Sequence, residues 1–266
     1  MERRLALVTG ASAGIGAAFA RIFASHGYDV ALTARRADRL ETLAEEIRLR
    51  AGVETLVVPA DLAQADAPTK VLKALAAQGR AVDALVNNAG YGLPGAYAMT
   101  RWEDQAAFLQ VMVRAPCELA HKVLPGMVER RYGRIVNVAS LAGLIPGSAG
   151  HTLYGATKAL MIRFSQSLHL ETLDQGVHVS ALCPGFTYSE FHDVNGTRAQ
   201  ISASTPPWLW LGADEVAATG YEAVEANRPV CVPGAPNKAI AAFVKVIPDD
   251  WGLALMASQG PRFRRV

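Results

Sequence analysis

The chain has 266 residues, of which 51% are hydrophobic and 19% are charged, and its formal net charge is +2. This composition indicates a large buried core beneath an ordinary water-facing surface, and the length suits one α/β domain. There is no basic block beyond residues 262–265 and no apolar run long enough to cross a bilayer, so we expect neither a nucleic-acid surface nor a membrane span.

Cysteine usage and the first residues bear on the cellular compartment. Cys117, Cys183 and Cys231 are odd in number and widely spaced, which predicts neither a disulfide framework nor a metal site. The amino-terminal residues run directly into an apolar segment without a signal-peptide pattern. We therefore expect a cytoplasmic protein with reduced, buried cysteines.

Short apolar runs alternate with segments of helical period along the chain. We expect strands at residues 5–8, 30–33, 55–58, 84–86, 134–138, 177–182 and 229–232, and helices that include residues 14–26, 37–50, 102–128 and 154–174. Strands that are apolar on both faces are typical of a parallel sheet covered by helices. The pattern predicts an α/β fold, with one Rossmann-like, doubly wound parallel sheet of about seven strands flanked by helices on both faces.

We expect residues 1–266 to form a single domain, because no Pro/Ser-rich linker divides the chain. The least regular part is residues 186–212, which contain two prolines and several aromatic side chains. A long loop in a compact α/β domain is usually functional, so this segment is predicted to be a substrate lid. Residues 233–266 follow the last expected strand as a C-terminal extension with an apolar helical stretch.

Residues 9–16 join the first expected strand to the first expected helix. In this segment Gly10 permits a tight turn, Gly14 lets the backbone approach a pyrophosphate, and Gly16 lets the helix pack against the strand. The helix N-terminus then offers unpaired N–H groups and a positive dipole end to phosphates. The residues expected to bind the pyrophosphate of a dinucleotide are Gly10, Ser12, Ala13, Gly14, Ile15 and Gly16.

The same turn has an alternative interpretation. Residues 10–14 also fit the G-x-S-x-G turn of α/β-hydrolases, with Ser12 as the nucleophile. That turn needs earlier strands and an upstream loop that supplies the oxyanion hole, and only nine residues precede Gly10. We therefore interpret Ser12 as a phosphate-loop hydroxyl and keep the hydrolase as the lesser alternative.

The end of the second strand predicts which dinucleotide binds. An NAD site usually places Asp or Glu about 20 residues after the glycines to bind the ribose 2′-hydroxyl, but Ala34 stands there. Arg35 and Arg36 instead offer a bidentate grip on a 2′-phosphate and a plane that stacks on adenine. The alternative is a solvated arginine pair, which a helix N-terminus disfavours unless an anion offsets the charge. The sequence therefore predicts NADP(H).

Further motifs follow in order: Asp61 after the third strand, Asn87-Asn88-Ala89-Gly90 after the fourth, Ser140 after the fifth, Tyr154-x-x-x-Lys158, and Pro184-Gly185 after the sixth. Together with the glycine turn, these motifs resemble those of the short-chain dehydrogenase/reductase family over residues 5–190. The resemblance implies an oxidoreductase that moves a hydride between a nicotinamide and a carbonyl or alcohol carbon.

Tyr154 and Lys158 are four residues apart, so on a helix they share one face. A phenol has a reference pKa of about 10, and a nearby ammonium and an oxidised nicotinamide would both lower that pKa toward neutrality. Tyr154 would then exchange a proton with the substrate oxygen, while Ser140 holds that oxygen and Lys158 also anchors the nicotinamide ribose. The alternative is an ordinary amphipathic helix with an exposed Tyr and Lys.

The resemblance also implies cofactor contacts from three connecting segments. These contacts would come from Asp61 and Leu62 beside the adenine, from Asn88, Ala89 and Gly90 beneath the adenosine ribose, and from Pro184, Gly185 and Thr187 on the nicotinamide side.

One departure from the family pattern concerns the helix after the fourth strand. The family usually has an Asn there, whose main-chain carbonyl holds a water leading to the Lys, but Met112 stands in its place. Pro116, four residues on, has no N–H to give to the carbonyl of residue 112. We hypothesise that Pro116 frees this carbonyl for the same water, which keeps Met112 in the catalytic set through its backbone. The alternative is a core methionine and a helix kink of no consequence.

The resemblance places the substrate cleft among the segments after the fourth and fifth strands and residues 186–212. The candidate substrate contacts are Tyr91, Leu144, His151, Phe186, Tyr188, Phe191 and Trp208. Their apolar and aromatic character predicts a rather hydrophobic or bulky substrate. The alternatives are that the rings pack the lid onto the body and that His151 is an ordinary loop residue.

These observations predict an NADP(H)-dependent oxidoreductase that interconverts a ketone or aldehyde and an alcohol, without a metal. A non-catalytic NADP(H)-binding protein stays an alternative because Met112 replaces the usual Asn. The resemblance also implies a homodimer or homotetramer that pairs through the helices at residues 102–128 and 154–174.

Overall fold

The structure is a computed structural model that describes residues 3–150, 152–190 and 205–263. Its central sheet has seven parallel strands in the order β3-β2-β1-β4-β5-β6-β9. The strands are β1 (Leu5–Thr9), β2 (Asp29–Thr33), β3 (Thr55–Val57), β4 (Val82–Asn87), β5 (Gly133–Val138), β6 (Val177–Leu182) and β9 (Val230–Cys231). Each corresponds to a predicted strand, and the doubly wound α/β fold is confirmed.

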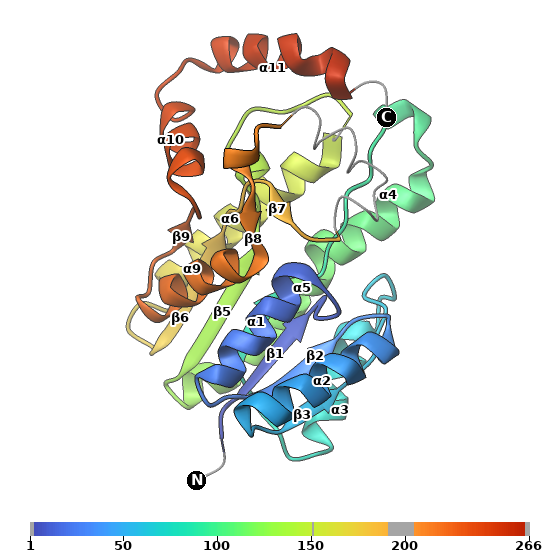
Figure 1. Ribbon diagram of the computed structural model, residues 1–266, viewed down its shortest axis with the longest axis vertical. Coiled ribbons are helices and arrows are strands. Elements are labelled where there is room, and N and C mark those ends of the chain that lie inside the picture. The colour runs from blue at the N-terminus through green and yellow to red at the C-terminus, as the bar shows by residue number, and fades with distance from the viewer. Residues whose placement is uncertain (1–2, 151, 191–204, 264–266) are drawn as a thin grey trace.

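Helices cover both faces of the sheet (Figure 1). One face carries α1 (Gly14–Ser25), α2 (Ala37–Ala51) and α9 (Ala213–Glu225), and the other carries α3 (Ala67–Ala76), α5 (Ala115–Glu129) and α6 (Thr152–Glu171). Side chains of β1 alternate between the two cores: Ala6 and Val8 pack on the first face, and Leu5 and Leu7 on the second. This alternation explains why the strand sequences are apolar throughout.

The strand order reverses at β1. The chain runs from β1 to β2 and β3 and then returns to β4 on the other side of β1. Open parallel sheets bind ligands beyond the carboxyl ends of their strands at such a reversal. The fold therefore brings the turn at residues 9–16 and the segment at residues 87–90 to one place.

The helix expected over residues 102–128 is interrupted, so that prediction is wrong in its detail. After the short η1 turn (Tyr97–Met99), α4 (Trp102–Leu109) passes into a π-helical turn, η2 (Gln110–Arg114), before α5 begins. Pro116 cannot donate the i→i+4 bond that the carbonyl of Met112 would accept in a regular helix, and the wider turn accommodates that loss. Single π-turns within helices are frequent at functional sites.

The described ends of residues 186–212 lie together. Strand β7 (Thr187–Tyr188) pairs in parallel with β8 (Leu211–Gly212), and the Leu211 N–H donates to the Phe186 carbonyl at 3.0 Å. Between them, η4 (Pro207–Leu209) precedes β8. Residues 191–204 lie outside the described part of the chain.

The C-terminal extension forms two helices, α10 (Ala235–Phe243) and α11 (Asp249–Phe263), which lie beyond the carboxyl end of the sheet (Figure 1). Helix α11 approaches the loop after β5 so closely that a Cβ at Gly252 would lie 2.8 Å from Pro146 Cγ. The extension therefore packs over the end of the sheet where the candidate residues gather.

Within the ranges that the structure describes, no helix combines the length and apolar character needed to cross a bilayer. The same ranges hold no cluster of three or more His, Cys, Asp and Glu side chains that could bind a metal. Cys183 and Cys231 are buried and Cys117 is half-buried, all three as free thiols. Burial raises the pKa of Cys183 to about 12 and that of Cys231 to about 11, which keeps both thiols neutral.

A buried ion-pair network ties β2 to the segments before β3 and β4. Arg80 Nη2 lies 2.8 Å from Asp29 Oδ2, and Arg80 Nη1 lies 2.6 Å from Glu54 Oε2. The Arg80 and Asp29 side chains are only 7% and 6% exposed. Removal of either buried partner leaves the other charge poorly compensated and away from water.

We expect Asp29→Ala to lower the free energy of unfolding by about 3–5 kcal/mol, measured by urea denaturation. The control is Asp66→Ala, which removes an exposed ion pair with Lys70 and is expected to cost less than about 1 kcal/mol. Equal losses in the two variants would contradict the prediction.

Candidate active site

The glycine turn after β1 forms a cradle that is lined by backbone atoms, because its glycines carry no side chains. Gly10 and Gly14 have φ values of +64° and +55°, a region that side chains disfavour. A Cβ at Gly16 would lie 2.2 Å from the Gly10 carbonyl oxygen, so only glycine lets α1 pack this close to the turn. The first turn of α1 carries no acidic residue. These features fit a dinucleotide whose phosphates lie at the helix N-terminus.

Thr9 joins this turn to the segment after β4. Its Oγ1 donates to the Val86 carbonyl at 3.1 Å and accepts from the Asn88 and Ala89 N–H groups at 2.9 and 3.0 Å. The Asn88 side-chain amide donates back to the Thr9 and Gly10 carbonyls. Thr9 therefore fixes both walls of the expected adenosine site relative to each other.

Arg35 and Arg36 do not act as a pair in the chain itself. Arg36 donates from Nη2 and Nε to Ser12 Oγ, at 2.9 and 3.3 Å, and so reaches the glycine turn. Arg35 is exposed, and its charge lowers the pKa of Tyr91, although burial of that hydroxyl raises the pKa overall. Arg36 thus faces the glycine turn and the charge of Arg35 acts on Tyr91, and their shared grip on a 2′-phosphate stays a prediction.

Asp61 and Leu62 lie in the loop after β3, at the carboxyl end of the parallel sheet. The Asp61 carboxylate accepts the Ala63 N–H at 3.1 Å, which fixes the loop. Leu62 is buried in a small apolar cluster that includes Val111, and Ala89 packs against that cluster. These residues lie where an adenine edge is expected from the sequence.

Ser140 lies close enough to Tyr154 for its side chain to lower the pKa of the phenol. Ser140 precedes the short η3 turn (Leu141–Gly143), and its Oγ accepts the Ala142 N–H at 3.1 Å. A Cβ at Gly143 would lie 2.6 Å from backbone atoms of Lys158 and Ala159, so glycine permits η3 to press against α6. This close approach sets the distance between the serine and the helix that carries Tyr154 and Lys158.

The two titratable groups of α6 have shifted pKa values. Burial raises the pKa of Tyr154 above its ordinary value, and the nearby Ser140 side chain acts to lower that pKa by a smaller amount. Burial lowers the pKa of Lys158 to about 8, and its Nζ lies 5.8 Å from the Tyr154 ring centroid. The lowered Tyr154 pKa expected from the sequence is therefore not found in the chain alone, where burial has the larger effect.

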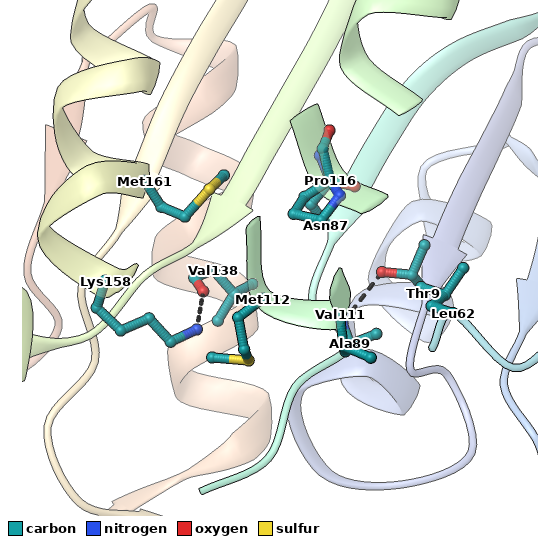
Figure 2. Close-up of a pocket in the computed structure, with 10 residues that line it drawn as sticks. All are labelled: Thr9, Leu62, Asn87, Ala89, Val111, Met112, Pro116, Val138, Lys158 and Met161. Atoms are coloured by element: carbon teal, nitrogen blue, oxygen red, sulfur yellow. Dashed lines mark hydrogen bonds between the residues drawn. The ribbon is translucent and has the colours of Figure 1, made fainter. Parts of the chain in front are cut away.

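Lys158 lines a small cavity with Met112, Pro116 and Asn87 (Figure 2). The cavity volume is about 10 Å³, at the lower limit for one water molecule. Lys158 Nζ donates to the Val138 carbonyl at 2.7 Å, and Asn87 Oδ1 is buried without a hydrogen-bond partner. The Met112 sulfur packs against Gly90 in the segment after β4, because a Cβ at Gly90 would lie 2.9 Å from that sulfur.

The glycine turn, Ser140, Tyr154 and buried Lys158 lie at one end of the sheet, and comparison with known proteins identifies the family. A model of the short chain dehydrogenase family matches residues 4–199. The chain belongs to the short-chain dehydrogenase family. An NADP-dependent 3-hydroxy acid dehydrogenase of Salmonella typhi is 36% identical over 227 residues, which cover 85% of this chain and 84% of that relative.

Solved structures of the family are similar over nearly the whole chain. A short-chain dehydrogenase from Sphingobium yanoikuyae in complex with NADPH is 31% identical, with a TM-score of 0.79 over 92% of this chain and 96% of that one. A bulky-bulky ketone specific alcohol dehydrogenase from Comamonas testosteroni is 28% identical, with a TM-score of 0.76 over 93% of this chain and 96% of that one.

The family's Pro-Gly motif lies beside the Ser140 turn. The Pro184 carbonyl accepts the Leu141 N–H at 2.9 Å, and Thr187 Oγ1 donates to the Gly185 carbonyl at 3.2 Å. A Cβ at Gly185 would lie 2.5 Å from Asn237 Oδ1, so α10 closes tightly on this motif. The structure thus brings the expected nicotinamide-side residues and the catalytic candidates together.

The aromatic candidates of residues 186–212 form one stack around Trp210. Tyr188 stacks on Trp210 at 4.9 Å between ring centroids, and Phe186 lies 5.5 Å from it. Trp210 is 8% exposed, whereas Tyr188 and Trp208 are 55% and 65% exposed. These contacts fit the packing alternative for Phe186, and the substrate contacts of Phe186, Tyr188 and Trp208 stay predictions.

The other substrate candidates divide between described and undescribed residues. Tyr91 packs edge-on against Phe108 at 5.4 Å, and Leu144 is half-buried against the core beneath α6. His151 and Phe191 lie outside the described residues, so the structure says nothing of their place.

Several site residues of this family member were not identified from the sequence. Asn137 is fully buried in β5; its Oδ1 accepts from Asn87, and its Nδ2 donates to Ser165 Oγ of α6 at 2.9 Å. This polar chain ties the helix of Tyr154 to the sheet, and a polar residue within the apolar run of β5 was its only sequence signal. Arg39 and Glu190 join Arg36 through ion pairs. Of these, only Arg39 was suggested by spacing, one helical turn after Arg36.

Proposed function

We propose that the chain is an NADP(H)-dependent oxidoreductase that interconverts a ketone or aldehyde and an alcohol. The observation that carries the proposal is the grouping of Ser140, Tyr154 and buried Lys158, with Lys158 Nζ 5.8 Å from the Tyr154 ring centroid, at the same end of the sheet as the glycine cradle. A phenol that can exchange a proton next to a bound nicotinamide is what carbonyl reduction requires. No such arrangement is needed by a protein that only binds the dinucleotide.

Each residue has a definite part in the reaction. NADP(H), when bound, supplies or accepts the hydride. Ser140 holds the substrate oxygen by a hydrogen bond, and Tyr154 gives that oxygen its proton in reduction or takes it in oxidation. Lys158 binds the nicotinamide ribose, and its positive charge stabilises the phenolate that Tyr154 becomes.

The cofactor is NADP(H) rather than NAD(H). Ala34 leaves the end of β2 without a carboxylate for a ribose 2′-hydroxyl, and Arg36 bonded to Ser12 offers cationic donors where a 2′-phosphate belongs. The similar Salmonella typhi enzyme is NADP-dependent, and the similar Sphingobium yanoikuyae enzyme was solved with NADPH.

The substrate is rather apolar or bulky. The described ends of residues 186–212 bring Tyr188 and Trp210 over the carboxyl end of the sheet, and these segments cover the substrate as a lid. The similarity to a ketone-specific enzyme whose substrates are bulky on both sides supports this size class.

The protein pairs as a homodimer or homotetramer through the faces of α4–α5 and α6. Large apolar side chains are exposed on these helices, namely Trp102, Leu160 and Leu170. Exposed apolar patches of this kind mark subunit contacts. Size-exclusion chromatography with light scattering tests this, and a monomer at micromolar concentration would contradict it.

The deciding experiment is a screen of aryl and alkyl ketones with NADPH and with NADH. Turnover is measured as the loss of absorbance of the reduced nicotinamide. The proposal expects ketone-dependent oxidation of NADPH. A protein that binds NADPH but turns over no ketone or alcohol would be the non-catalytic alternative.

The hydrolase alternative has no support in the site. Ser12 Oγ accepts from the Arg36 guanidinium, which stays protonated and cannot act as a base. Ester turnover without nucleotide, abolished by Ser12→Ala, would restore that alternative.

We also propose that the Met112 carbonyl holds a water next to Lys158. The π-turn, the missing N–H of Pro116 and the cavity lined by Met112 and Lys158 all support it. We expect Pro116→Ala, which supplies an N–H to this turn, to lower kcat severalfold with an unchanged KM for NADPH. Steady-state kinetics measures both constants, and an unchanged kcat would leave Met112 as a core methionine only.

A further inference from the structure

The carboxylate of Glu190 contacts Arg36, which belongs to the proposed 2′-phosphate site, and Arg39, one helical turn further along α2. Arg36 Nη2 is 2.8 Å from Glu190 Oε2, and Arg39 Nη1 pairs with Glu190 Oε1. Arg36 is the same guanidinium that donates to Ser12 Oγ in the glycine turn. An anion supplied by the chain itself therefore uses the donors that a 2′-phosphate would use.

Glu190 is held in this place by the segment that precedes it. Thr187 and Tyr188 are fixed by their pairing with β8, only two residues before Glu190. A Cβ at Gly14 would lie 2.7 Å from Ser189 Cβ, so the segment lies directly against the glycine turn. Glu190 consequently approaches the site from the opposite wall to α2, which carries Arg39.

The ion pairs of Glu190 with Arg36 and Arg39 form at neutral pH, and a phosphate can displace the carboxylate from them. A hydrogen bond from Arg39 and the charge of Arg36 hold the pKa of Glu190 below its ordinary value, so the side chain is an anion at neutral pH. The side chains of Arg36, Arg39 and Glu190 are 40%, 46% and 37% exposed, and pairs this exposed to water contribute little. A phosphate with nearly two negative charges and three acceptor oxygens binds the same arginines better than one carboxylate does.

We propose that Glu190 is a specificity-determining residue of the cofactor site: its carboxylate competes with the 2′-phosphate of NADP(H) for Arg36 and Arg39. NADP(H) must displace it, whereas NAD(H), which has a 2′-hydroxyl, leaves the ion pairs in place. The preference for NADP(H) is therefore smaller than the arginines alone would give. This inference rests on the proposed NADP(H) site.

The test compares the wild-type chain with Glu190→Gln by calorimetric titration of NADPH, NADH, adenosine 2′,5′-bisphosphate and AMP. The variant keeps the side-chain size and removes the competing charge. We expect the Kd of NADPH and of the bisphosphate to fall about three- to fivefold, the range of one exposed ion pair. The Kd values of NADH and AMP stay within about twofold, and the difference between the proteins narrows at high salt.

Two controls test whether the change in the NADPH Kd comes from the Glu190 charge acting on Arg36. Glu103→Gln removes the same charge from an exposed pair with Arg101 on α4 and should change no Kd. In the Arg36→Gln background, the effect of Glu190→Gln on the NADPH Kd should shrink, because the contested donor is gone.

The outcomes separate this inference from the function on which it rests. If the wild-type chain binds neither NADPH nor NADH, the proposed function fails and this inference with it. If NADPH binds but its Kd is the same in Glu190→Gln, only the competition is refuted. An equal gain for NADPH and NADH also overturns it, since Glu190 would then act on the whole dinucleotide rather than on the 2′-phosphate.

Discussion

Replacing Tyr154 by phenylalanine is expected to lower kcat for ketone reduction by about 1,000-fold, within the range that one general acid contributes. The substitution removes one oxygen from a buried side chain near Ser140 and leaves the ring in place. The glycine turn and Arg36 do not depend on that oxygen, so the Kd of NADPH should change by less than about twofold.

The control for this prediction is Tyr221→Phe. Tyr221 lies in α9, where its ring packs against Phe23 and His26 of α1 rather than beside Ser140. We expect its kcat to equal that of the wild-type chain. Steady-state rates with any active ketone, together with NADPH titration, measure both quantities, and a Tyr154→Phe enzyme that keeps a tenth of its kcat would refute the acid–base role.

The strands, the reversal at β1 and the glycine turn could all be predicted, because each follows from local patterns. Apolar runs define buried strands, and Gly10, Gly14 and Gly16 are required by backbone geometry that no other residue satisfies. The Ser140, Tyr154 and Lys158 positions were also accessible, because their motifs resemble those of the family.

The missed features depend on contacts that are distant in sequence. The pairing of Arg39 with Glu190 joins residues 151 positions apart, and no local pattern in either segment requires it. The Asn87–Asn137 hydrogen bond likewise depends on the parallel register of β4 and β5, which places the two residues opposite each other. The π-turn could have been inferred from Pro116, but helical period alone predicts a continuous helix over the same residues.

The pKa of Tyr154 shows the same limit in chemical terms. Spacing alone gives a tyrosine and a lysine on one helix face, and it predicts a lowered tyrosine pKa. The buried environment, which spacing does not reveal, raises the pKa of Tyr154 and lowers that of Lys158 to about 8. Burial thus acts on both groups before any cofactor charge does, and it disfavours the charged form of each.

The second large effect on activity is expected for Lys158→Met, which replaces the buried ammonium by an uncharged side chain. The variant loses the donor proposed for the nicotinamide ribose and the charge beside Tyr154, and misplacement of the reacting groups should lower kcat/KM by at least about 100-fold. The exposed Lys70→Met serves as the control and should keep full activity.

The stability of the same variant should move in the opposite direction to its activity. Lys158 has a pKa of about 8 in the folded chain and about 10.4 when unfolded, so between these values the unfolded state binds more protons. The contribution of Lys158 to the free energy of unfolding therefore rises with pH through this window and is lost as the pH falls through 8.

At pH 7 the buried ammonium opposes folding, and methionine of similar length does not. Urea denaturation from pH 7 to 10 should show Lys158→Met as stable as the wild type or more so at pH 7, with an advantage that shrinks as the pH rises. A variant that is less stable at pH 7, with no such pH trend, would mean that Lys158 is held in the fold by its hydrogen bond to Val138 and not kept there for chemistry.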